Sequence, residues 1–260
     1  MSSKDKVLEL LENNKTEYIS GEAIASQLGL SRNAIWKAIN ELRKAGYKIE
    51  AVSNKGYMLG EENDIISAQG IASYIVSGSQ DIGSIDKFHI YDTVDSTNKL
   101  AKEMAIAGAE HGTLIVANTQ GTGRGRKDHS FFSPKGGIYM SIILSPAKLD
   151  SLKPDDITLQ VGSAVCQSIE NLCSVKPVIK PINDLFVDGK KICGILTEAG
   201  TEFDSGLVQW IVVGIGINFD SDLSAFPKEL QDIVGSLFKP GMASVSKNQL
   251  IAEIYNRIVK

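Results

Sequence analysis

A glycine- and arginine-rich loop, Gly121–Pro134 (GTGRGRKDHSFFSP), separates two short apolar segments and constrains how this chain can fold. The segments Thr113–Asn118 and Ile138–Leu144 are rich in β-branched and aromatic residues and bounded by Gly or Pro, which is typical of strands. Alternate glycines let backbone N–H groups approach a ligand closely. The guanidinium groups of Arg124 and Arg126 can bind carboxylate or phosphate through paired hydrogen bonds. The sequence therefore predicts two strands joined by an anion-binding loop.

This loop matches neither of two common phosphate-binding motifs. The P-loop motif requires Ser or Thr after its lysine, whereas Asp128 follows Lys127. The dinucleotide motif G-x-G-x-x-G requires a third glycine one residue later than Gly125 and then a helix, whereas we expect a strand. A mobile, solvated basic loop is the alternative that composition alone allows.

Three segments, in chain order, resemble the signature motifs of biotin protein ligases. They are Asp95–Asn98 (DSTN), Gln120–Ser141 with its GRGR sequence, and Lys180–Glu198 (KPINDLFVDGKKICGILTE) with an Asn-Asp pair and Lys-x-x-Gly-Ile. The family joins biotin to ATP as biotinyl-5′-AMP and then transfers biotin to a lysine of a biotin carboxyl carrier protein. The resemblance implies a biotin–[acetyl-CoA-carboxylase] ligase that uses biotin, ATP and Mg²⁺.

The first sixty residues predict a winged helix-turn-helix. Apolar periodicity indicates helices over Lys4–Asn13, Ser20–Leu28 and Arg32–Ala45, and Tyr47–Val52 with Gly56–Leu59 forms a hairpin typical of a wing. Contacts to operator DNA are expected from the second helix of the motif and from the wing, through Ser31, Arg32, Asn33, Trp36, Lys37, Lys48 and Lys55. A three-helix dimerisation or protein-binding module is the alternative, and Trp36 could equally belong to the core.

With this N-terminal domain, the resemblance points to the bifunctional class, in which the ligase also represses biotin genes. Biotinyl-5′-AMP would then be both reaction intermediate and corepressor. Ordering of the loop Gly121–Ser133 on the adenylate would favour a homodimer, and its two winged helices would meet two operator half-sites.

Charge and composition place few limits on function. The net charge is −4, but residues 1–60 carry nine Lys/Arg and seven Asp/Glu, a net +2 that only permits DNA binding. No apolar run approaches the ~18–20 residues of a membrane span, and the N-terminus lacks the apolar region of a secretory signal. The three cysteines show no paired metal-ligand spacing, which favours reduced thiols and a cytoplasmic protein.

An acidic segment, Glu61–Asp64, marks the predicted domain boundary. We expect a winged helix domain over residues 1–62 and a catalytic domain over residues 63–260. The predicted helices of the second domain are Ile65–Val76, Asp95–Ala107, Ile157–Leu172 and Lys247–Val259, and its further strands are Phe88–Val94, Val178–Ile179, Leu185–Val187, Lys191–Glu198 and Leu207–Ile217. Interspersed strands and helices predict an α+β fold with a mixed sheet, and the resemblance implies the class II synthetase/biotin ligase type.

The resemblance also assigns roles to single residues. Lys191 would bridge the biotin carboxylate and the α-phosphate, Arg124 and Arg126 would add positive charge, and Asp184 would hold Mg²⁺ or fix Lys191. The other expected contacts are Ser96, Thr97, Asn98, Gln120 and Gly194 toward biotin, Gly123 and Gly125 through the loop backbone, Asn183 beside Asp184, and Phe131 and Asn218 toward adenine. Plainer explanations exist: helix capping for Ser96, turn chemistry for Asn183 with Asp184, and an exposed strand position for Lys191.

Four features depart from the family pattern. His129 stands where a second arginine is usual and carries less charge at neutral pH, and Phe131 replaces a tryptophan. Pro181 is shifted within its motif, and the chain ends at Lys260 on the helix that precedes a small C-terminal β-barrel in relatives. His129 and the missing barrel leave open a biotin-sensing repressor with weak or no ligase activity. A sister acyl ligase that acts on lipoate or another fatty acid is a further alternative, against which the helix-turn-helix and the GRGR loop argue.

Overall fold

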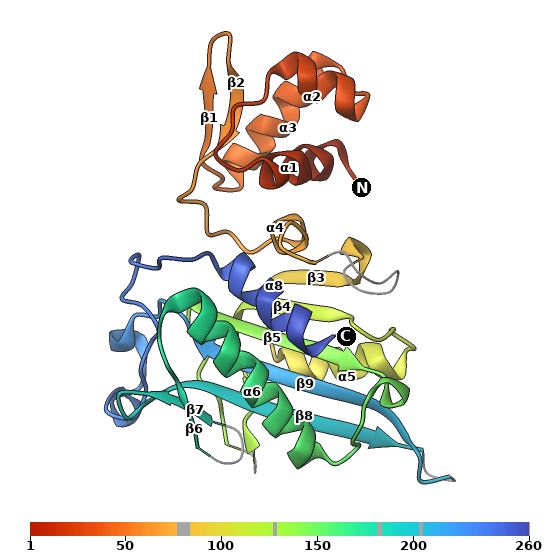
Figure 1. The fold of residues 1–260 in the computed structure, drawn as a ribbon, viewed down its shortest axis with the longest axis vertical. Coiled ribbons are helices and arrows are strands. Elements are labelled where there is room, and N and C mark those ends of the chain that lie inside the picture. The colour runs from red at the N-terminus through yellow and green to blue at the C-terminus, as the bar shows by residue number, and fades with distance from the viewer. Residues whose placement is uncertain (77–83, 127–128, 181–183, 203–204, 260) are drawn as a thin grey trace. The chain divides into compact units, whose positions relative to one another are not determined.

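The computed structural model describes residues 1–76, 84–126, 129–180, 184–202 and 205–259. They form two compact units, Met1–Ile75 and Val76–Lys260 (Figure 1). The first unit ends at Ile75, whereas the sequence predicted a boundary after residue 62. The difference arises because the short helix α4 (Ala68–Ala72) packs against α1 of the first unit. The predicted helix over Ile65–Val76 is wrong in its length, since only α4 forms there.

The first unit is a winged helix-turn-helix, as predicted. Besides α4 it contains α1 (Ser3–Asn13), α2 (Gly21–Leu28), α3 (Arg32–Lys44), β1 (Ile49–Val52) and β2 (Gly56–Leu59). Gly29 ends α2 with a left-handed backbone, φ 62°, which a glycine adopts without steric cost. Ser31 then begins α3, because its Oγ accepts a hydrogen bond of 3.2 Å from the N–H of Ala34.

The wing is an antiparallel hairpin anchored to the chain before α2. The N–H of Ile19 donates to the carbonyl of Tyr57 and the N–H of Tyr57 donates back, both at 2.9 Å. Gly56 makes this approach possible, since a Cβ there would lie 2.0 Å from the carbonyl oxygen of Ile19. The side chains of Ile35, Ile39 and other members of the apolar face of α3 pack into one core with α1, α2 and the wing.

The second unit is built on a seven-stranded mixed sheet, which confirms the α+β prediction. In spatial order its strands are β3 (Phe88–Val94), β4 (Leu114–Gln120), β5 (Gly137–Leu144), β9 (Val208–Asn218), β8 (Lys190–Thr201), β7 (Asp184–Val187) and β6 (Val178–Lys180). Only β3 and β4 pair in parallel, and every other neighbouring pair is antiparallel.

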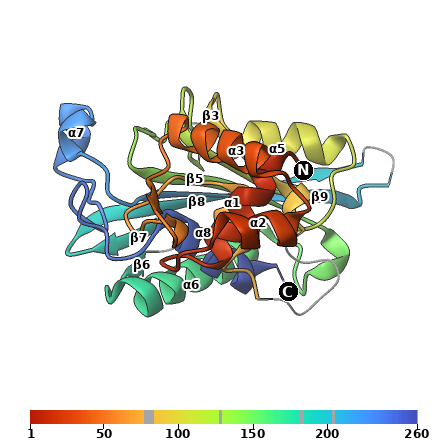
Figure 2. The same ribbon diagram turned by 90° about the horizontal axis from the view of Figure 1, so that it is seen from above.

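Helices cover both faces of this sheet. α5 (Thr97–Ile106) lies on one face, and α6 (Pro154–Cys173) and α8 (Lys247–Ile258) lie on the other (Figures 1 and 2). Shorter elements are α7 (Lys228–Gln231) and the 3₁₀ turns Ile85–Lys87, Pro146–Lys148 and Leu223–Ala225. Among the described helices, none combines the length and apolar character that a membrane span requires.

Two central strands place glycines side by side. In the antiparallel pair β8–β9, Gly194 lies opposite Gly216 and Leu196 lies opposite Gly214. Glycines in a central strand indicate close approach by another group, because they leave the sheet surface without side chains. The loop between β4 and β5 supplies the group at Gly194 and Gly216, and α5 supplies the group at Gly214.

Candidate active site and DNA-binding face

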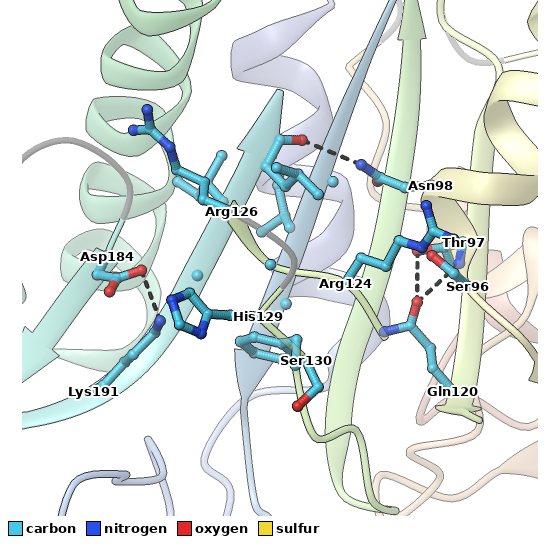
Figure 3. Close-up of a pocket in the computed structure, with 18 residues that line it drawn as sticks. Ser96, Thr97, Asn98, Gln120, Arg124, Arg126, His129, Ser130, Asp184 and Lys191 are labelled. Atoms are coloured by element: carbon cyan, nitrogen blue, oxygen red, sulfur yellow. Dashed lines mark hydrogen bonds and ion pairs between the residues drawn. The ribbon is translucent and has the colours of Figure 1, made fainter. Parts of the chain in front are cut away.

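A cavity of about 240 Å³ lies over β8 and β9 in the second unit, beside the loop that joins β4 to β5 (Figure 3). It is lined by Ser96, Thr97, Asn98, Gln120, Arg124, Gly125, Arg126, His129, Ser130, Phe131, Asp184, Lys191, Gly194, Ile195, Leu196, Gly214, Ile215 and Gly216. The cavity therefore brings together most of the ligand-binding residues that the sequence predicted, from segments separated by more than half of the second unit.

One wall of the cavity is polar and is made by the start of α5 and the end of β4. Ser96 caps α5, with its Oγ 3.4 Å from the N–H of Lys99, so the capping explanation holds alongside a ligand-binding one. The N–H of Thr97 donates to Oε1 of Gln120 at 2.8 Å. Ser96, Thr97 and Asn98 are all buried, which holds their polar groups in defined positions.

A lysine–aspartate pair from β8 and β7 faces the opposite side of the cavity. Nζ of Lys191 lies 2.8 Å from Oδ1 of Asp184, and both side chains are only 26% exposed. The explanation of Lys191 as an exposed strand lysine is therefore wrong. A partly buried ammonium held by one carboxylate keeps further N–H donors for a ligand.

The loop is a small hairpin, and its two arginines, Arg124 and Arg126, point in different directions. The N–H of Gly125 donates to the carbonyl of His129 at 2.7 Å, and the N–H of Phe131 donates to the carbonyl of Gly123 at 2.8 Å. Arg124 extends toward the polar wall, whereas Arg126 points toward α6 (Figure 3). Nη2 of Arg126 lies 3.4 Å from Oδ1 of Asp155, at the start of that helix.

In the described part of the chain, the guanidinium of Arg124 has no ion-pair partner, and its side chain lines the cavity. An unpaired cation beside a polar wall attracts a ligand anion. His129 lines the same cavity, so the position that departs from the family pattern belongs to the site.

The ring of Phe131 lies on the glycines of the central strands. A Cβ on Gly216 would lie 2.5 Å from this ring, and one on Gly194 would lie 3.0 Å from it. The ring centroid is also 5.9 Å from Nζ of Lys191. The glycines therefore admit the aromatic ring of the loop next to the cation of β8.

Three predicted ligand contacts lie elsewhere or cannot be placed. Gly123 underlies the loop, where a Cβ would lie 2.3 Å from the carbonyl oxygen of Phe131. Asn218 is buried and its Nδ2 donates to the carbonyl of Gly235 at 2.9 Å, so it braces the end of β9. Asn183 lies outside the described residues.

The sequence reading did not assign Ser130, Ile195, Leu196, Gly214, Ile215 or Gly216 to the site. The signal for the two glycines was present, since alternate glycines in a buried strand indicate that something packs closely on them. The identity of that group, the ring of Phe131 at Gly216 and the amide of Asn98 at Gly214, depends on the tertiary fold.

The described residues contain no group of three or more His, Cys, Asp or Glu side chains suited to a metal ion. Mg²⁺ on a nucleotide needs only one or two carboxylates, because phosphate oxygens and water complete its coordination. Asp184, which lines the cavity, provides one carboxylate and fits such a site.

All three cysteines are free. Burial raises the pKa of the Cys173 thiol to about 11, and it also raises the pKa of Cys193, on β8, and of Cys166. These thiols are therefore protonated at neutral pH and are not activated nucleophiles.

The first unit exposes one face of α3. Arg32, Asn33, Trp36 and Lys37 are all exposed, and Trp36 retains 57% of its accessible surface, so its assignment to the core is wrong. Ser31 is engaged as the cap of α3. On the wing, Lys48 pairs with Glu62, and Nζ of Lys55 lies 5.5 Å from the ring centroid of Tyr18.

The chain combines a helix-turn-helix unit with a sheet domain in which cations line a polar cavity. This combination defines a DNA-binding protein with a ligand-processing domain. Residues 4–58 match the family described as HTH domain, and residues 90–218 match the Biotin/lipoate A/B protein ligase family. The bifunctional ligase/repressor BirA of Bacillus subtilis strain 168 is 39% identical over 249 residues, which cover 95% of this chain and 74% of that protein. This chain therefore belongs to the family of bifunctional biotin protein ligases and repressors.

More distant proteins agree. The bifunctional ligase/repressor BirA of Escherichia coli K12 is 33% identical over 218 residues, covering 82% of this chain and 62% of that protein. The biotin protein ligase of Aquifex aeolicus, solved with biotin and ATP, aligns with a TM-score of 0.54 and 26% identity over 66% of this chain and 68% of the other. These matches also confirm the fold class that the sequence predicted.

Proposed function

We propose that this chain catalyses ATP-dependent biotinylation of a lysine on a biotin carboxyl carrier protein. The observation that carries the proposal is the convergence of Arg124, Lys191 and the polar wall of Thr97 and Gln120 on one cavity. Such a cavity offers neutral hydrogen-bonding groups beside Arg124 at one side and the ammonium of Lys191 at the other (Figure 3). Biotin has the matching form, with a polar ring joined by an aliphatic chain to a carboxylate.

In the first step, an oxygen of the biotin carboxylate attacks the α-phosphorus of ATP and pyrophosphate leaves. Two anions must approach each other, so positive charge has to be in place beforehand. The ammonium of Lys191 is suited to contact both the carboxylate and the α-phosphate, and Asp184 holds it in position. Arg124 and Arg126 extend this positive field from the loop. Mg²⁺, held in part by Asp184, would neutralise charge on the phosphates.

In the second step, the uncharged amine of the acceptor lysine attacks the carbonyl carbon of biotinyl-5′-AMP, and AMP leaves as the biotinyl amide forms. Lys191 remains next to the departing phosphate and stabilises its charge. Phe131, which lies within 5.9 Å of Nζ of Lys191, offers a flat surface for the adenine beside that phosphate.

The same adenylate would act as corepressor of biotin genes. The exposed face of α3, with Arg32, Asn33, Trp36 and Lys37, is the surface that would enter the major groove of the operator, while Lys48 and Lys55 of the wing would reach phosphates. Adenylate binding would order the loop and favour a homodimer that places two winged helices on two half-sites. The free cysteines favour action in the cytoplasm.

Incubation of the chain with biotin, ATP and Mg²⁺, followed by mass spectrometry of the small molecules, tests the first step. We expect biotinyl-5′-AMP, and transfer to a carboxyl carrier domain when that acceptor is added. Binding of biotin without adenylate would instead support a biotin-sensing repressor without ligase activity. Tighter binding of lipoate than of biotin would support the acyl ligase alternative.

A further inference from the structure

A buried hydroxyl connects the polar wall of the cavity to the loop that carries Phe131. Nε2 of Gln120 donates to Oγ of Ser133 at 2.8 Å, and Oγ of Ser133 donates to the carbonyl oxygen of Phe131 at 2.9 Å. Ser133 is buried and does not line the cavity, whereas Gln120 and Phe131 both do. Ser133 therefore contacts two residues of the site while lying outside the cavity itself.

The direction of each hydrogen bond in this connection has a single solution. The backbone N–H of Thr97 is a donor, so the atom of Gln120 that lies 2.8 Å from it must be the amide oxygen. The amide nitrogen of Gln120 consequently faces Ser133, and the hydroxyl must accept from it. A carbonyl oxygen can only accept, so the one proton of Ser133 goes to Phe131. The connection therefore uses the hydroxyl both as acceptor and as donor.

The backbone leaves room for this connection at Gly123. A Cβ there would lie 2.3 Å from the carbonyl oxygen of Phe131, 2.8 Å from Oγ of Ser133 and 3.0 Å from Nε2 of Gln120. The glycine therefore packs directly on the three connected groups, and a side chain would push them apart. This contact gives Gly123 a structural reason that involves no ligand.

The wall side of the connection has other supports, whereas the loop side depends on Ser133. The amide oxygen of Gln120 is held by the N–H of Thr97, and the backbone N–H of Gln120 donates to the carbonyl of Ser133 at 3.3 Å. The backbone N–H of Phe131 donates to the carbonyl of Gly123, but this bond lies within the loop and moves with it. Loss of the hydroxyl should therefore release the loop more than the wall.

We propose that Ser133 is a positioning residue that holds the ring of Phe131 on the glycines of β8 and β9, and thereby sets the affinity for the nucleotide without contacting it. The ring position matters because its centroid lies 5.9 Å from Nζ of Lys191. The inference rests on the proposed function, in which Phe131 offers a surface for adenine beside the phosphate that Lys191 contacts.

The substitution Ser133→Ala tests the position of the ring without any ligand. Gly194 and Gly216 lie against the ring of Phe131, so its ring current displaces their α-proton NMR resonances. Phe131→Leu has no ring and defines the shift that loss of the ring current causes. In Ser133→Ala both resonances should shift in the same direction as in Phe131→Leu, because the ring leaves the glycines.

The matched control for this experiment is Thr122→Val. It removes a hydroxyl that donates to the carbonyl of Asp95 at 3.3 Å, at the base of the same loop. Thr122 is exposed and has no hydrogen bond to the polar wall or to Phe131 among the described residues. Thr122→Val should leave the two glycine resonances and the kinetics of adenylate formation unchanged.

The kinetics of adenylate formation test the consequence for the nucleotide. Ser133→Ala should raise the KM for ATP about tenfold, the scale of one buried carbonyl left without its donor. The KM for biotin should change by less than about threefold, since Gln120 keeps its hydrogen bond to Thr97. In a Phe131→Leu background, Ser133→Ala should raise the KM for ATP no further, because the ring that it positions is already absent.

A conservative variant distinguishes the hydroxyl from the space it fills. Ser133→Cys keeps a weaker donor and acceptor of similar size, so its KM for ATP should rise by only about threefold. Thermal unfolding identifies the variants that are folded at the assay temperature, and Ser133→Cys carries the test if Ser133→Ala is not among them.

The outcomes separate two kinds of failure. If the unsubstituted chain forms no adenylate, the proposed function is wrong, and the glycine resonances still report whether Ser133 positions the ring. Unchanged resonances in Ser133→Ala would overturn the positioning role. A KM for ATP that stays normal, rises equally with the KM for biotin, or rises as much in the Phe131→Leu background would overturn the link to the nucleotide.

Discussion

The two units of this protein build their working surfaces in different ways. The exposed face of α3 comes from one helix, and its candidate DNA contacts Arg32, Asn33, Trp36 and Lys37 lie within two turns. The cavity of the second unit draws on α5, β4, the loop, β7, β8 and β9, from Ser96 to Gly216. A helical face follows from local periodicity, whereas a cavity depends on which strands become neighbours. The two surfaces should therefore respond separately to substitution.

The sharpest test of this separation is Lys191→Ala, which removes the cation between the two reacting anions. We expect adenylate formation to fall about 10³-fold, the upper range for loss of one preorganised charged donor. Pyrophosphate release measures this rate, and circular dichroism should show both units folded. Lys190→Ala is the matched control, because Lys190 is the neighbouring residue on β8 and its Nζ donates to the carbonyl of Asp232 instead of lining the cavity. An equal loss in both variants would contradict the assignment of Lys191.

The dependence of the cavity on neighbouring strands is tested by Gly216→Ala. The new methyl group would lie 2.5 Å from the ring of Phe131 and displace the loop. Adenylate formation should fall about 10²-fold through misplacement of the site, and overpacking should cost about 1–3 kcal/mol of unfolding free energy. Gly121→Ala is the control, since nothing lies within 4 Å of its added Cβ. Normal activity in Gly216→Ala would show that the ring position is unimportant.

For the first unit, Lys37→Ala should weaken operator binding several-fold and leave adenylate formation unchanged. If Lys37 contacts a phosphate, the slope of log affinity against log salt should fall by about 1. Fluorescence anisotropy with labelled operator DNA at several salt concentrations measures this slope. Lys6→Ala, at an exposed position of α1, should change neither quantity. A drop in adenylate formation with Lys37→Ala would contradict the independence of the two units.

The smallest expected effect concerns Glu12, a buried carboxyl in the core of the first unit. Burial is the largest influence on its pKa and raises it above 4.5, and Lys15, 3.7 Å away, offsets this only in part. The folded state therefore binds the proton more tightly than the unfolded state. The stability that the Glu12 carboxyl contributes is present below pH 4.5. It is lost as the pH rises through the pKa that Glu12 has in the folded state.

Glu12→Gln removes the buried charge and should raise the unfolding free energy of the first unit at pH 7, with a smaller gain at pH 4. Thermal unfolding at both pH values measures the difference. Glu17→Gln, at an exposed position of the same unit, is the control. A gain that does not depend on pH would show that the charge of Glu12 is not the cause.

Much of the fold followed from local patterns. Apolar periodicity predicted α1, α2 and α3, and Ser20, Ser31 and Ser96 each cap the helix that the sequence led us to expect. The helix predicted over Ile65–Val76 was too long, because the tertiary contacts of α4 involve only a short segment. α7 was not predicted, since a helix of four residues leaves almost no periodic signal.

The sequence by itself determined the kinds of chemistry available: cations on a glycine-rich loop, a capped helix with adjacent hydroxyls, and a helix-turn-helix with an exposed basic face. Only the tertiary structure decided how these groups meet. It placed Phe131 on Gly216, turned Asn218 inward to Gly235, and connected Thr97 through Ser141 and Asn98 to Glu198. The physical reason is that spacing along the chain governs neighbours within a helix or hairpin, whereas the pairing of β5 with β9 places Gly137 opposite Asn218, a residue far along the chain.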